Sequence, residues 1–515
     1  MQFTENEIAQ IEQHGLSLPE VQRQLEILSK GLPPTYVLQP ATVNNGILRF
    51  DAGKMKALQE VFDKQKQDYK LQKFVPASGA ATRMFKEWVY FHNNYKIGKD
   101  YYERFVKKHQ LGTFEPYLDD FLANFPGFAF YQDVMDAISS ALPEYFQLDE
   151  NEQVWHLIHF VLSDEGLGYQ NLPKALLKFH RYGKQAVTAL EEHLQEATAY
   201  TQDASGRGRV HFTISPQHLQ AYTHLVDTLQ AQYDIDISHS FQKPETDTVM
   251  VYKDNNEIVR DENGAIVFRP GGHGSLIDNI QDLDADIIFV KNIDNVQKGD
   301  KQLETVQYKK VLGGYLLDIL QQSYTYLGEL RDNKPVGEAL REIENFAHKT
   351  LNINFIEGYE TLNNSGKRQY LAYKINRPVC VAGMVINTGE PGGGPFWAKD
   401  KNGLKSLQIV EKAQIDIKNP EQKAILEQST HFNPVDLVLS IKDFEGNKFD
   451  LKSFVNEDAA FLTEKSYNGK PVKVYERPGL WNGAMDDWNT VFIEVPIETF
   501  SPVKTVVDLL KEAHR

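Results

Sequence analysis

The chain has 515 residues, with 55 Lys and Arg against 71 Asp and Glu, so its formal net charge is −16. No basic run is long enough to follow a phosphate backbone, which argues against a nucleic-acid partner but leaves a small nucleotide open. The single cysteine, Cys380, excludes an internal disulfide framework, and the lack of a signal-peptide or membrane-length apolar pattern predicts a cytoplasmic protein with no membrane partner.

The first 70 residues predict a helical N-terminal extension. Thr4-x-x-Glu7 and Ser17-x-x-Glu20 have the capping-box pattern, and each leads into apolar residues at helical spacing. Residues 71–515 predict one large α/β domain, which begins with a strand at residues 73–76. Within this domain, residues 88–165 are rich in aromatic side chains at helical spacing, and we expect them to form a helical insertion.

The rest of the domain predicts alternating strands and helices. We expect strands at residues 210–215, 287–290, 379–385 and 407–410, a hairpin at 249–268, and helices at 216–233, 306–331 and 335–349. Residues 492–510 predict a strand, a Pro-bounded turn and a last helix.

A glycine loop, a helix and a buried strand follow one another at residues 268–296. Gly271, Gly272 and Gly274 allow the backbone to take a positive φ or to approach a ligand closely. Asp294 comes directly after the strand. Since ligands of open α/β sheets bind at the carboxyl ends of strands, we expect a ligand site at this aspartate.

A second candidate site is the small-residue turn after the first strand. Backbone N–H groups in such a turn can point at an anion, and Arg83 adds a fixed charge. Taken alone the turn is weak support, because small residues also serve packing between a strand and a helix. The candidate anion-binding residues are Ala77, Ser78, Gly79, Ala80, Ala81 and Thr82.

The stretch FVPASGAATRMF, which contains this turn, resembles the first signature of sugar-nucleotide pyrophosphorylases. The turn of that signature ends in Gly-Thr-Arg-Met, and the signature closes with Pro-Lys. Pro173-Lys174 is similar to this closing pair and is displaced by the helical insertion. Further similar patches follow in the family's order: FTISPQH from Phe212, Phe241-Gln242, Pro270-Gly271-Gly272-His273-Gly274, Asn292-Ile293-Asp294-Asn295, and Phe500-Ser501-Pro502-Val503-Lys504 with Asp508-Leu509-Leu510. The chain as a whole, including GEPGGGPFW, STHFNPVDLV and PGLWNGAMDDWNT, resembles a bacterial family of unassigned function related to the UDP-glucose and UDP-N-acetylglucosamine pyrophosphorylases.

The resemblance implies a nucleotide-diphospho-sugar transferase-like fold (GT-A, Rossmann-like), with a mixed sheet and helices on both faces. It implies a magnesium-dependent nucleotidyltransferase that joins a nucleoside triphosphate, UTP first among them, to a sugar 1-phosphate and releases pyrophosphate. UTP is favoured because the Gly-His-Gly element is shared with uridylyl enzymes.

The resemblance also implies a role for individual residues. Asp294 would hold Mg²⁺, while Arg83, Lys174 and Lys504 would contact the phosphates. The nucleotide would lie against the turn from Ala77 to Thr82 and against Gln242, Gly272, His273 and Gly274. The sugar would contact Gly389, Glu390, Glu411 and Asn433.

Two departures from the family pattern leave alternatives open. Ala80-Ala81 stands where the family has glycine, and a Cβ there narrows the approach to the phosphates. The second metal carboxylate has four candidates, Asp436, Asp486, Asp487 and Glu494. The rival functions are a glycosyltransferase of the same fold, whose usual Asp-x-Asp is absent from the strand end, and a nucleotide-sugar sensor without turnover. The sequence leaves the sugar and the oligomeric state open.

Overall fold

A computed structural model describes residues 3–97, 101–389 and 392–515 of the chain. The chain forms two compact units, each assembled from stretches that are far apart in sequence. Unit 1 contains residues 1–74, 240–290 and 307–497, and unit 2 contains residues 75–239, 291–306 and 498–515. The predicted boundary at residue 70 divides the chain by its sequence pattern, not by compact units, and it stays a prediction.

Unit 1 is built on a mixed β-sheet whose strands lie in the order β2-β3-β19-β12-β16-β11-β4. Strand β11 runs parallel to β4, and β12 runs parallel to β19 but antiparallel to β16. The predicted strands at 73–76, 287–290 and 379–385 are all present. The strands are Thr42–Val43 (β2), Gly46–Leu48 (β3), Leu71–Pro76 (β4), Ile287–Lys291 (β11), Val379–Ile386 (β12), Asp436–Ser440 (β16) and Asn489–Glu494 (β19).

Helices cover both faces of this sheet. On one face, the ring of Phe62 in α3 (Ala52–Gln65) meets that of Phe289 in β11 at a centroid distance of 5.9 Å. The next residues along β11, Ile288 and Val290, point to the opposite face because side chains alternate along a strand. There they share an apolar core with α11 (Ile277–Asp282).

Two smaller sheets complete unit 1. One joins β1 (Val37–Pro40), β13 (Gly393–Lys399) and β14 (Lys405–Glu411), and the other has the order β10-β9-β18-β17. The second consists of Thr248–Tyr252 (β9), Phe268–Arg269 (β10), Phe461–Tyr467 (β17) and Lys470–Glu476 (β18). The predicted hairpin at 249–268 is therefore present as β9 and β10, joined in register from Phe268 to Val249.

The N-terminal 70 residues are not only helical. The expected helices form as α1 (Glu5–Gln13), α2 (Leu18–Lys30) and α3, but residues between α2 and α3 supply β1, β2 and β3. Strand β1 pairs with β13 and strand β3 pairs with β19. Such short strands depend on partners hundreds of residues away, so local sequence patterns do not predict them.

The remaining helices of unit 1 follow residue 302 in the chain. Helix α12 (Leu303–Arg331) starts in unit 2 and continues through unit 1, where α13 (Glu338–Lys349) and α14 (Asn364–Ile375) lie side by side. Helix α15 (Pro420–Glu427) and the short strand β15 (His431–Phe432) follow.

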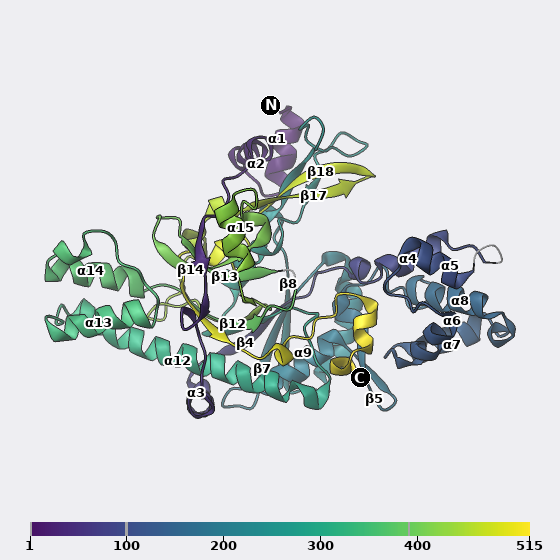
Figure 1. Ribbon diagram of the computed structural model, residues 1–515, viewed down its shortest axis with the longest axis horizontal. Coiled ribbons are helices and arrows are strands. Elements are labelled where there is room, and N and C mark those ends of the chain that lie inside the picture. Colours follow the sequence, from purple (N-terminus) through teal and green to yellow (C-terminus); the bar gives the residue numbers. More distant parts are fainter. Residues whose placement is uncertain (1–2, 98–100, 390–391) are drawn as a thin grey trace. The chain divides into compact units, whose positions relative to one another are not determined.

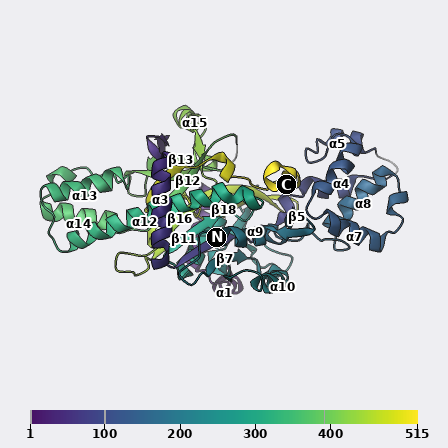
Figure 2. The same ribbon diagram turned by 90° about the horizontal axis from the view of Figure 1, so that it is seen from below.

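Unit 2 contains the helical insertion, which forms as helices α4 to α8 and stays one group in both views (Figures 1 and 2). Trp88 is fully buried at its centre and packs against the rings of Phe114, Phe121, Phe125 and Phe128. These helices are Lys86–Asn94 (α4), Tyr102–His109 (α5), Leu118–Asn124 (α6), Tyr131–Ala141 (α7) and Glu150–Leu162 (α8).

The other elements of unit 2 are the hairpin β5 (Lys178–Tyr182) and β6 (Gln185–Thr188), helices α9 (Ala189–Thr198) and α10 (Leu219–Gln230), and the neighbouring strands β7 (Gly208–Ile214) and β8 (Ile235–Phe241). The last helix expected from the sequence is a short 3₁₀ helix, Val506–Leu510. In the part of the chain that the structure describes, no helix is long and apolar enough to cross a membrane.

A glycine in α12 sets how closely that helix approaches α3. A Cβ at Gly314 would lie 2.0 Å from the carbonyl oxygen of Leu58, whereas a Cβ at Gly328 on the same helix meets no atom within 4 Å. We expect Gly314→Ala to destabilise the fold by about 1–3 kcal/mol through overpacking. Gly328→Ala is the matched control and should stabilise by about 0.5–1 kcal/mol, because alanine favours a helix. Thermal unfolding of the parent and of the two variants measures the change in stability that each substitution causes. Equal changes in the two variants would contradict the close contact between Gly314 and Leu58.

Candidate active site

The small-residue turn after β4 is held beside Pro173-Lys174 in unit 2. The amide of Ala81 donates to the carbonyl of Leu172 at 3.1 Å, and the amide of Lys174 donates to the carbonyl of Gly79 at 3.3 Å. Ala80 and Pro173 form the bridge between them. The two halves of the family-like signature, separated in sequence by the helical insertion, therefore lie side by side.

Lys174 is the centre of the hydrogen bonds in this part of unit 2. Its ammonium group donates to Asp294 Oδ2 at 2.8 Å and to the carbonyl of Val503 at 2.7 Å. The amide of Val503 in turn donates to the carbonyl of Asp294 at 2.9 Å. The side chains of Lys174 and Asp294 are 13% and 23% exposed, so solvent reaches both. We call Lys174, Asp294 and Val503 the lysine–aspartate group.

Lys504 follows this group directly, on a turn that Asp508 holds. The amides of Lys504 and Thr505 donate to Asp508 Oδ2 at 2.9 and 2.6 Å. Burial raises the pKa of Asp508, but hydrogen bonds from Lys511 and Thr505 outweigh it and hold the pKa below its usual value. Asp508 therefore stays ionised and fixes the backbone that carries Lys504. The resemblance covered Asp508 without giving it a role.

The small-residue turn itself faces solvent along most of its length. Gly79, Ala80, Thr82 and Arg83 are exposed, while Ala77 and Ala81 are buried in the core of unit 2. The amide of Ala77 donates to the carbonyl of Thr213 at 2.9 Å, which ties the start of the turn to β7. Because the methyl group of Ala81 faces the core, only that of Ala80 lies on the exposed side, where a phosphate would approach.

The glycine loop belongs to unit 1 and holds His273 from three sides. The amide of Leu480 donates to His273 Nδ1 at 3.0 Å, and the imidazole stacks on Trp481 with ring centroids 4.1 Å apart. Since Nδ1 accepts a hydrogen bond, the neutral ring carries its proton on Nε2, which lies 3.5 Å from Glu411 Oε1. Two residues expected to contact different parts of the ligand, His273 and Glu411, are thus neighbours.

Trp481 was not among the predicted site residues. It lies in the PGLWNGAMDDWNT stretch that carried part of the family resemblance, so the sequence contained a signal for it. Its contact with His273 depends on the fold of unit 1, which brings residues 270–274 against residues 477–481.

Packing within unit 1 by itself requires glycines in this loop. A Cβ at Gly274 would lie 2.0 Å from the carbonyl oxygen of Pro478, and Gly272 has a φ of +82°. The amide of Arg477 donates to the carbonyl of Gly271 at 2.9 Å. The loop therefore needs these glycines to fit against residues 476–478, whether or not a nucleobase also approaches it.

The other residues of unit 1 that were predicted to contact the ligand lie in different surroundings. Asn433 is buried; its amide donates to the carbonyl of Gly383 at 2.9 Å and its oxygen accepts from the amide of Val435 at 3.0 Å, so it holds a turn. Gln242 Nε2 is buried and has no hydrogen-bond acceptor among the described residues. Gly389 has a φ of +110° and its amide donates to Asn387. Glu390 lies outside the described residues.

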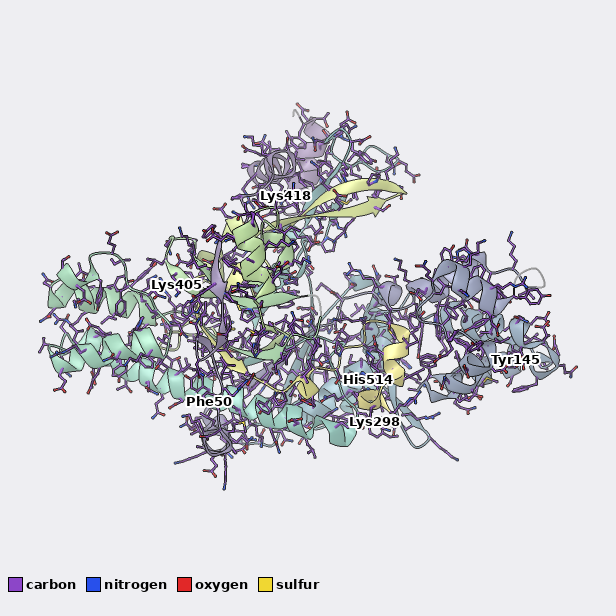
Figure 3. All side chains as sticks on the ribbon, in the orientation of Figure 1. Phe50, Tyr145, Lys298, Lys405, Lys418 and His514 are labelled. Atoms are coloured by element: carbon purple, nitrogen blue, oxygen red, sulfur yellow. The ribbon has the colours of Figure 1, made fainter. Side chains whose placement is uncertain are left out.

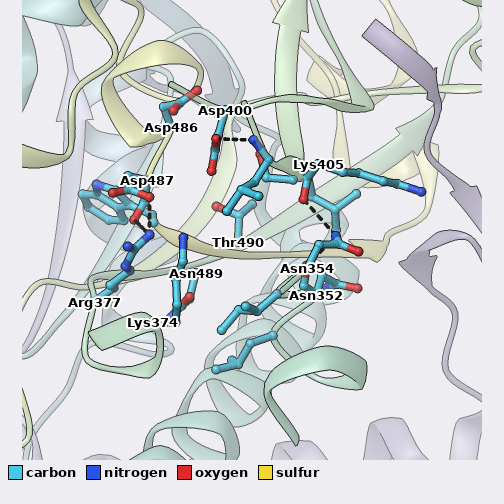
Figure 4. Close-up of a pocket in the computed structure, with 16 residues that line it drawn as sticks. Asn352, Asn354, Lys374, Arg377, Asp400, Lys405, Asp486, Asp487, Asn489 and Thr490 are labelled. Carbon is cyan, nitrogen blue, oxygen red and sulfur yellow. Dashed lines mark hydrogen bonds and ion pairs between the residues drawn. The ribbon is translucent and has the colours of Figure 1, made fainter. Parts of the chain in front are cut away.

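The four candidates for a second metal carboxylate are all engaged within unit 1. Asp436 pairs with the buried ammonium of Lys309, and Glu494 pairs with Arg49 and His431. Figure 4 shows Asp487 paired with Arg377, beside Asp486. Asp486 accepts from the amide of Lys401 at 2.9 Å. Across residues 3–97, 101–389 and 392–515, no three His, Cys, Asp or Glu side chains form a group that could hold a metal ion.

Asp294 is compatible with a magnesium ion that takes its other ligands from a substrate. One carboxylate oxygen accepts from Lys174, and the other has no hydrogen-bond donor within the described chain. Mg²⁺ commonly uses one or two carboxylates together with phosphate oxygens and water. The single carboxylate of Asp294, near the small-residue turn, fits that set of ligands.

Comparison with known proteins places the chain in a family. A family model described as "Domain of unknown function (DUF4301)" matches residues 4–515. No curated protein matches the chain.

Solved structures that resemble the chain include UDP-sugar pyrophosphorylases, at low identity. A Trypanosoma brucei UDP-N-acetylglucosamine pyrophosphorylase in complex with an inhibitor is 13% identical, with 98% of this chain and 76% of that chain covered and a TM-score of 0.46. A mutant Leishmania major UDP-glucose pyrophosphorylase in complex with UDP-glucose is 12% identical, with coverages of 99% and 79% and a TM-score of 0.43. A T. brucei UDP-glucose phosphorylase is 13% identical, with coverages of 99% and 80% and a TM-score of 0.44.

The buried carboxyl group of Asp486 makes stability depend on pH. Burial, with smaller contributions from Asp400 and Asp487, raises the pKa of Asp486 to about 6. A carboxyl group with a raised pKa favours the folded state most when it is protonated, and this contribution is lost as the pH rises through about 6. Asp486→Asn removes the titration. We therefore expect the melting temperature of this variant, relative to the parent, to rise between pH 4 and pH 7, and a pH-independent difference would contradict the assignment.

Proposed function

The chain belongs to the DUF4301 family, and we propose that it is a nucleotidyltransferase that joins a nucleoside triphosphate to a sugar 1-phosphate and releases pyrophosphate. The observation that carries the proposal is the lysine–aspartate group. Lys174, Asp294 and Val503 come from three separate patches of the pyrophosphorylase-like sequence, and direct hydrogen bonds of 2.7–2.9 Å join them. The small-residue turn is hydrogen-bonded to the same Lys174 segment.

The mixed sheet with helices on both faces supports a nucleotide-diphospho-sugar transferase-like fold of the GT-A type as part of this proposal. The glycine loop precedes strand β11, and Asp294 follows the end of that strand. Ligands of open α/β sheets bind at the carboxyl ends of strands, which is where this aspartate lies in the chain.

In the proposed reaction, a phosphate oxygen of the sugar 1-phosphate attacks the α-phosphorus of the triphosphate. The bond from that phosphorus to the bridging oxygen breaks, and pyrophosphate leaves with the electron pair. Both reactants are anions, so the chain must supply positive charge and hold them in line. Lys174 and Lys504 supply cations near the reacting phosphates, and Arg83 with the exposed amides of the turn binds the departing pyrophosphate.

Magnesium, when bound, would neutralise phosphate charge in the transition state. Asp294 would hold it, with phosphate oxygens and water as the other ligands. Lys174 donates to Asp294 Oδ2, so it fixes the orientation of this carboxylate before any ligand arrives.

We propose UTP as the nucleotide and the loop of Gly272, His273 and Gly274 as its base-contacting element. His273 Nδ1 accepts a hydrogen bond from the amide of Leu480, so the neutral ring has its proton on Nε2, directed toward Glu411. Glu411 then belongs beside the base loop as well as near the sugar. Magnesium dependence, a bacterial origin and a cytoplasmic location are further parts of the proposal.

The function is tested by measuring pyrophosphate release from each of the four nucleoside triphosphates with a panel of sugar 1-phosphates and Mg²⁺. We expect release that needs the sugar phosphate and is fastest with UTP. Asp294→Asn and Lys174→Met should each lower kcat by about 10²–10³-fold, because each removes a group that stabilises charge in the transition state.

Asp284→Asn is the matched control, because this carboxylate is exposed and pairs only with Lys70 at 2.6 Å. It should leave the rate unchanged. If no triphosphate gives pyrophosphate while UDP-sugar still binds in calorimetry, the chain is a sensor. Sugar transfer from UDP-sugar to an acceptor, without pyrophosphate release, would favour a glycosyltransferase.

A further inference from the structure

A cavity of about 330 Å³ in unit 2 is lined by cationic side chains and is separate from the candidate active site. Arg181, Lys298 and Arg515 line it, together with His514 and Phe179. Neither Lys174, Asp294, Arg83 nor Lys504 contributes to its wall. Figure 3 labels Lys298 and His514, which lie near each other in this unit.

Among the residues that the structure describes, no acidic side chain lines this cavity. Within the described residues, none of Arg181, Lys298 and Arg515 forms an ion pair. Arg181 donates to the carbonyl of Pro126 at 3.4 Å, and the ammonium of Lys298 lies 5.4 Å from the ring of Tyr182. In a chain with a net charge of −16, three cationic side chains around one cavity favour an anionic occupant.

His514, which lines the cavity beside these cations, belongs to a buried hydrogen-bond network. His514 is 4% exposed, and its Nδ1 lies 2.8 Å from Nε2 of the fully buried His180. His180 Nδ1 lies 2.7 Å from Glu192 Oε1, and Tyr182 and Gln302 also donate to Glu192. Burial and the neighbouring His180 lower the pKa of His514 to about 3, so this ring is neutral and adds no charge to the cavity.

The cavity shares chain segments with the candidate active site. Lys298 lies four residues after Asp294, and its amide donates to the carbonyl of Ala513 at 3.1 Å. Gln297 donates to Ser501 Oγ at 3.2 Å, just before the segment that carries Val503 and Lys504. A ligand in the cavity would therefore contact both segments that hold the lysine–aspartate group.

We infer that this cavity is a second anion site that binds a phosphate group of a small molecule, with Arg181 and Lys298 as its main cationic contacts. Planar guanidinium groups pair with two phosphate oxygens at once, and the ammonium adds a point charge. The volume admits a free phosphate, a pyrophosphate or a small phosphomonoester. The inference does not rest on the proposed reaction, because it concerns binding alone.

The test measures the binding of inorganic phosphate, pyrophosphate and glycerol phosphate to the full chain by calorimetry. In the double variant Arg181→Gln/Lys298→Gln, we expect the Kd of the tightest of the three to rise at least about tenfold, since each charged hydrogen bond contributes on the order of a tenfold change. The control is Lys184→Gln/Arg207→Gln, which removes the same charge from exposed positions of unit 2 outside the cavity. It should bind as the parent does.

Two further arms separate this site from the candidate active site and from general charge effects. Lys174→Met should retain the binding that the cavity provides. In the parent chain, the ligand should protect Lys298, but not Lys184, from acylation measured by mass spectrometry, a readout that needs no variant to fold. Equal weakening by both double variants, no protection of Lys298, or no binding of any of the three anions would overturn the inference.

Discussion

The ammonium group of Lys174 joins three parts of the chain that the sequence keeps far apart. The ammonium donates to Asp294 and to the carbonyl of Val503. The backbone amide of Lys174 donates to the carbonyl of Gly79 in the small-residue turn. A partly buried ammonium needs acceptors on several sides, because burying a charge without partners is costly. The Lys174 side chain therefore adds to the backbone hydrogen bonds that hold the turn, the aspartate and the segment before Lys504 together.

In unit 1, the glycine loop is held mainly by backbone contacts rather than by an ion pair. Gly274 packs against the carbonyl of Pro478, and His273 is held between Leu480, Trp481 and Glu411. A loop held this way presents a preorganised ring and a preorganised proton donor. For ligand binding, such rigidity lowers the entropy lost on association. The histidine is therefore better placed to select a ligand than an isolated surface imidazole would be.

The acidic residues show how burial separates structural carboxylates from available ones. Asp436, Asp487 and Glu494 each pair with a cation, and Asp486 accepts from the backbone. Asp294 also has a cationic partner, yet one of its oxygens has no donor in the described chain, and the side chain is open to solvent. One oxygen of Asp294 is therefore available to a ligand, whereas a ligand of Asp436 or Asp487 would first have to break a buried ion pair, at a cost in free energy.

Local sequence patterns predicted the elements whose signals are local. Capping boxes placed α1 and α2, continuous apolar runs placed β11 and β12, and aromatic spacing placed the helices around Trp88. Asp294 was predicted beside a strand end for the same reason. Strands β1 and β3 were missed, because their stability comes from pairing with β13 and β19 and leaves no pattern in four or fewer residues. The sequence by itself determined the α/β class, the helical insertion and the candidate residues Lys174, Asp294 and His273. Only the tertiary structure decided that Lys174 bonds to Asp294, that Trp481 and Glu411 flank His273, and that Asn433 holds a turn, because each of these depends on contacts between residues distant in the chain.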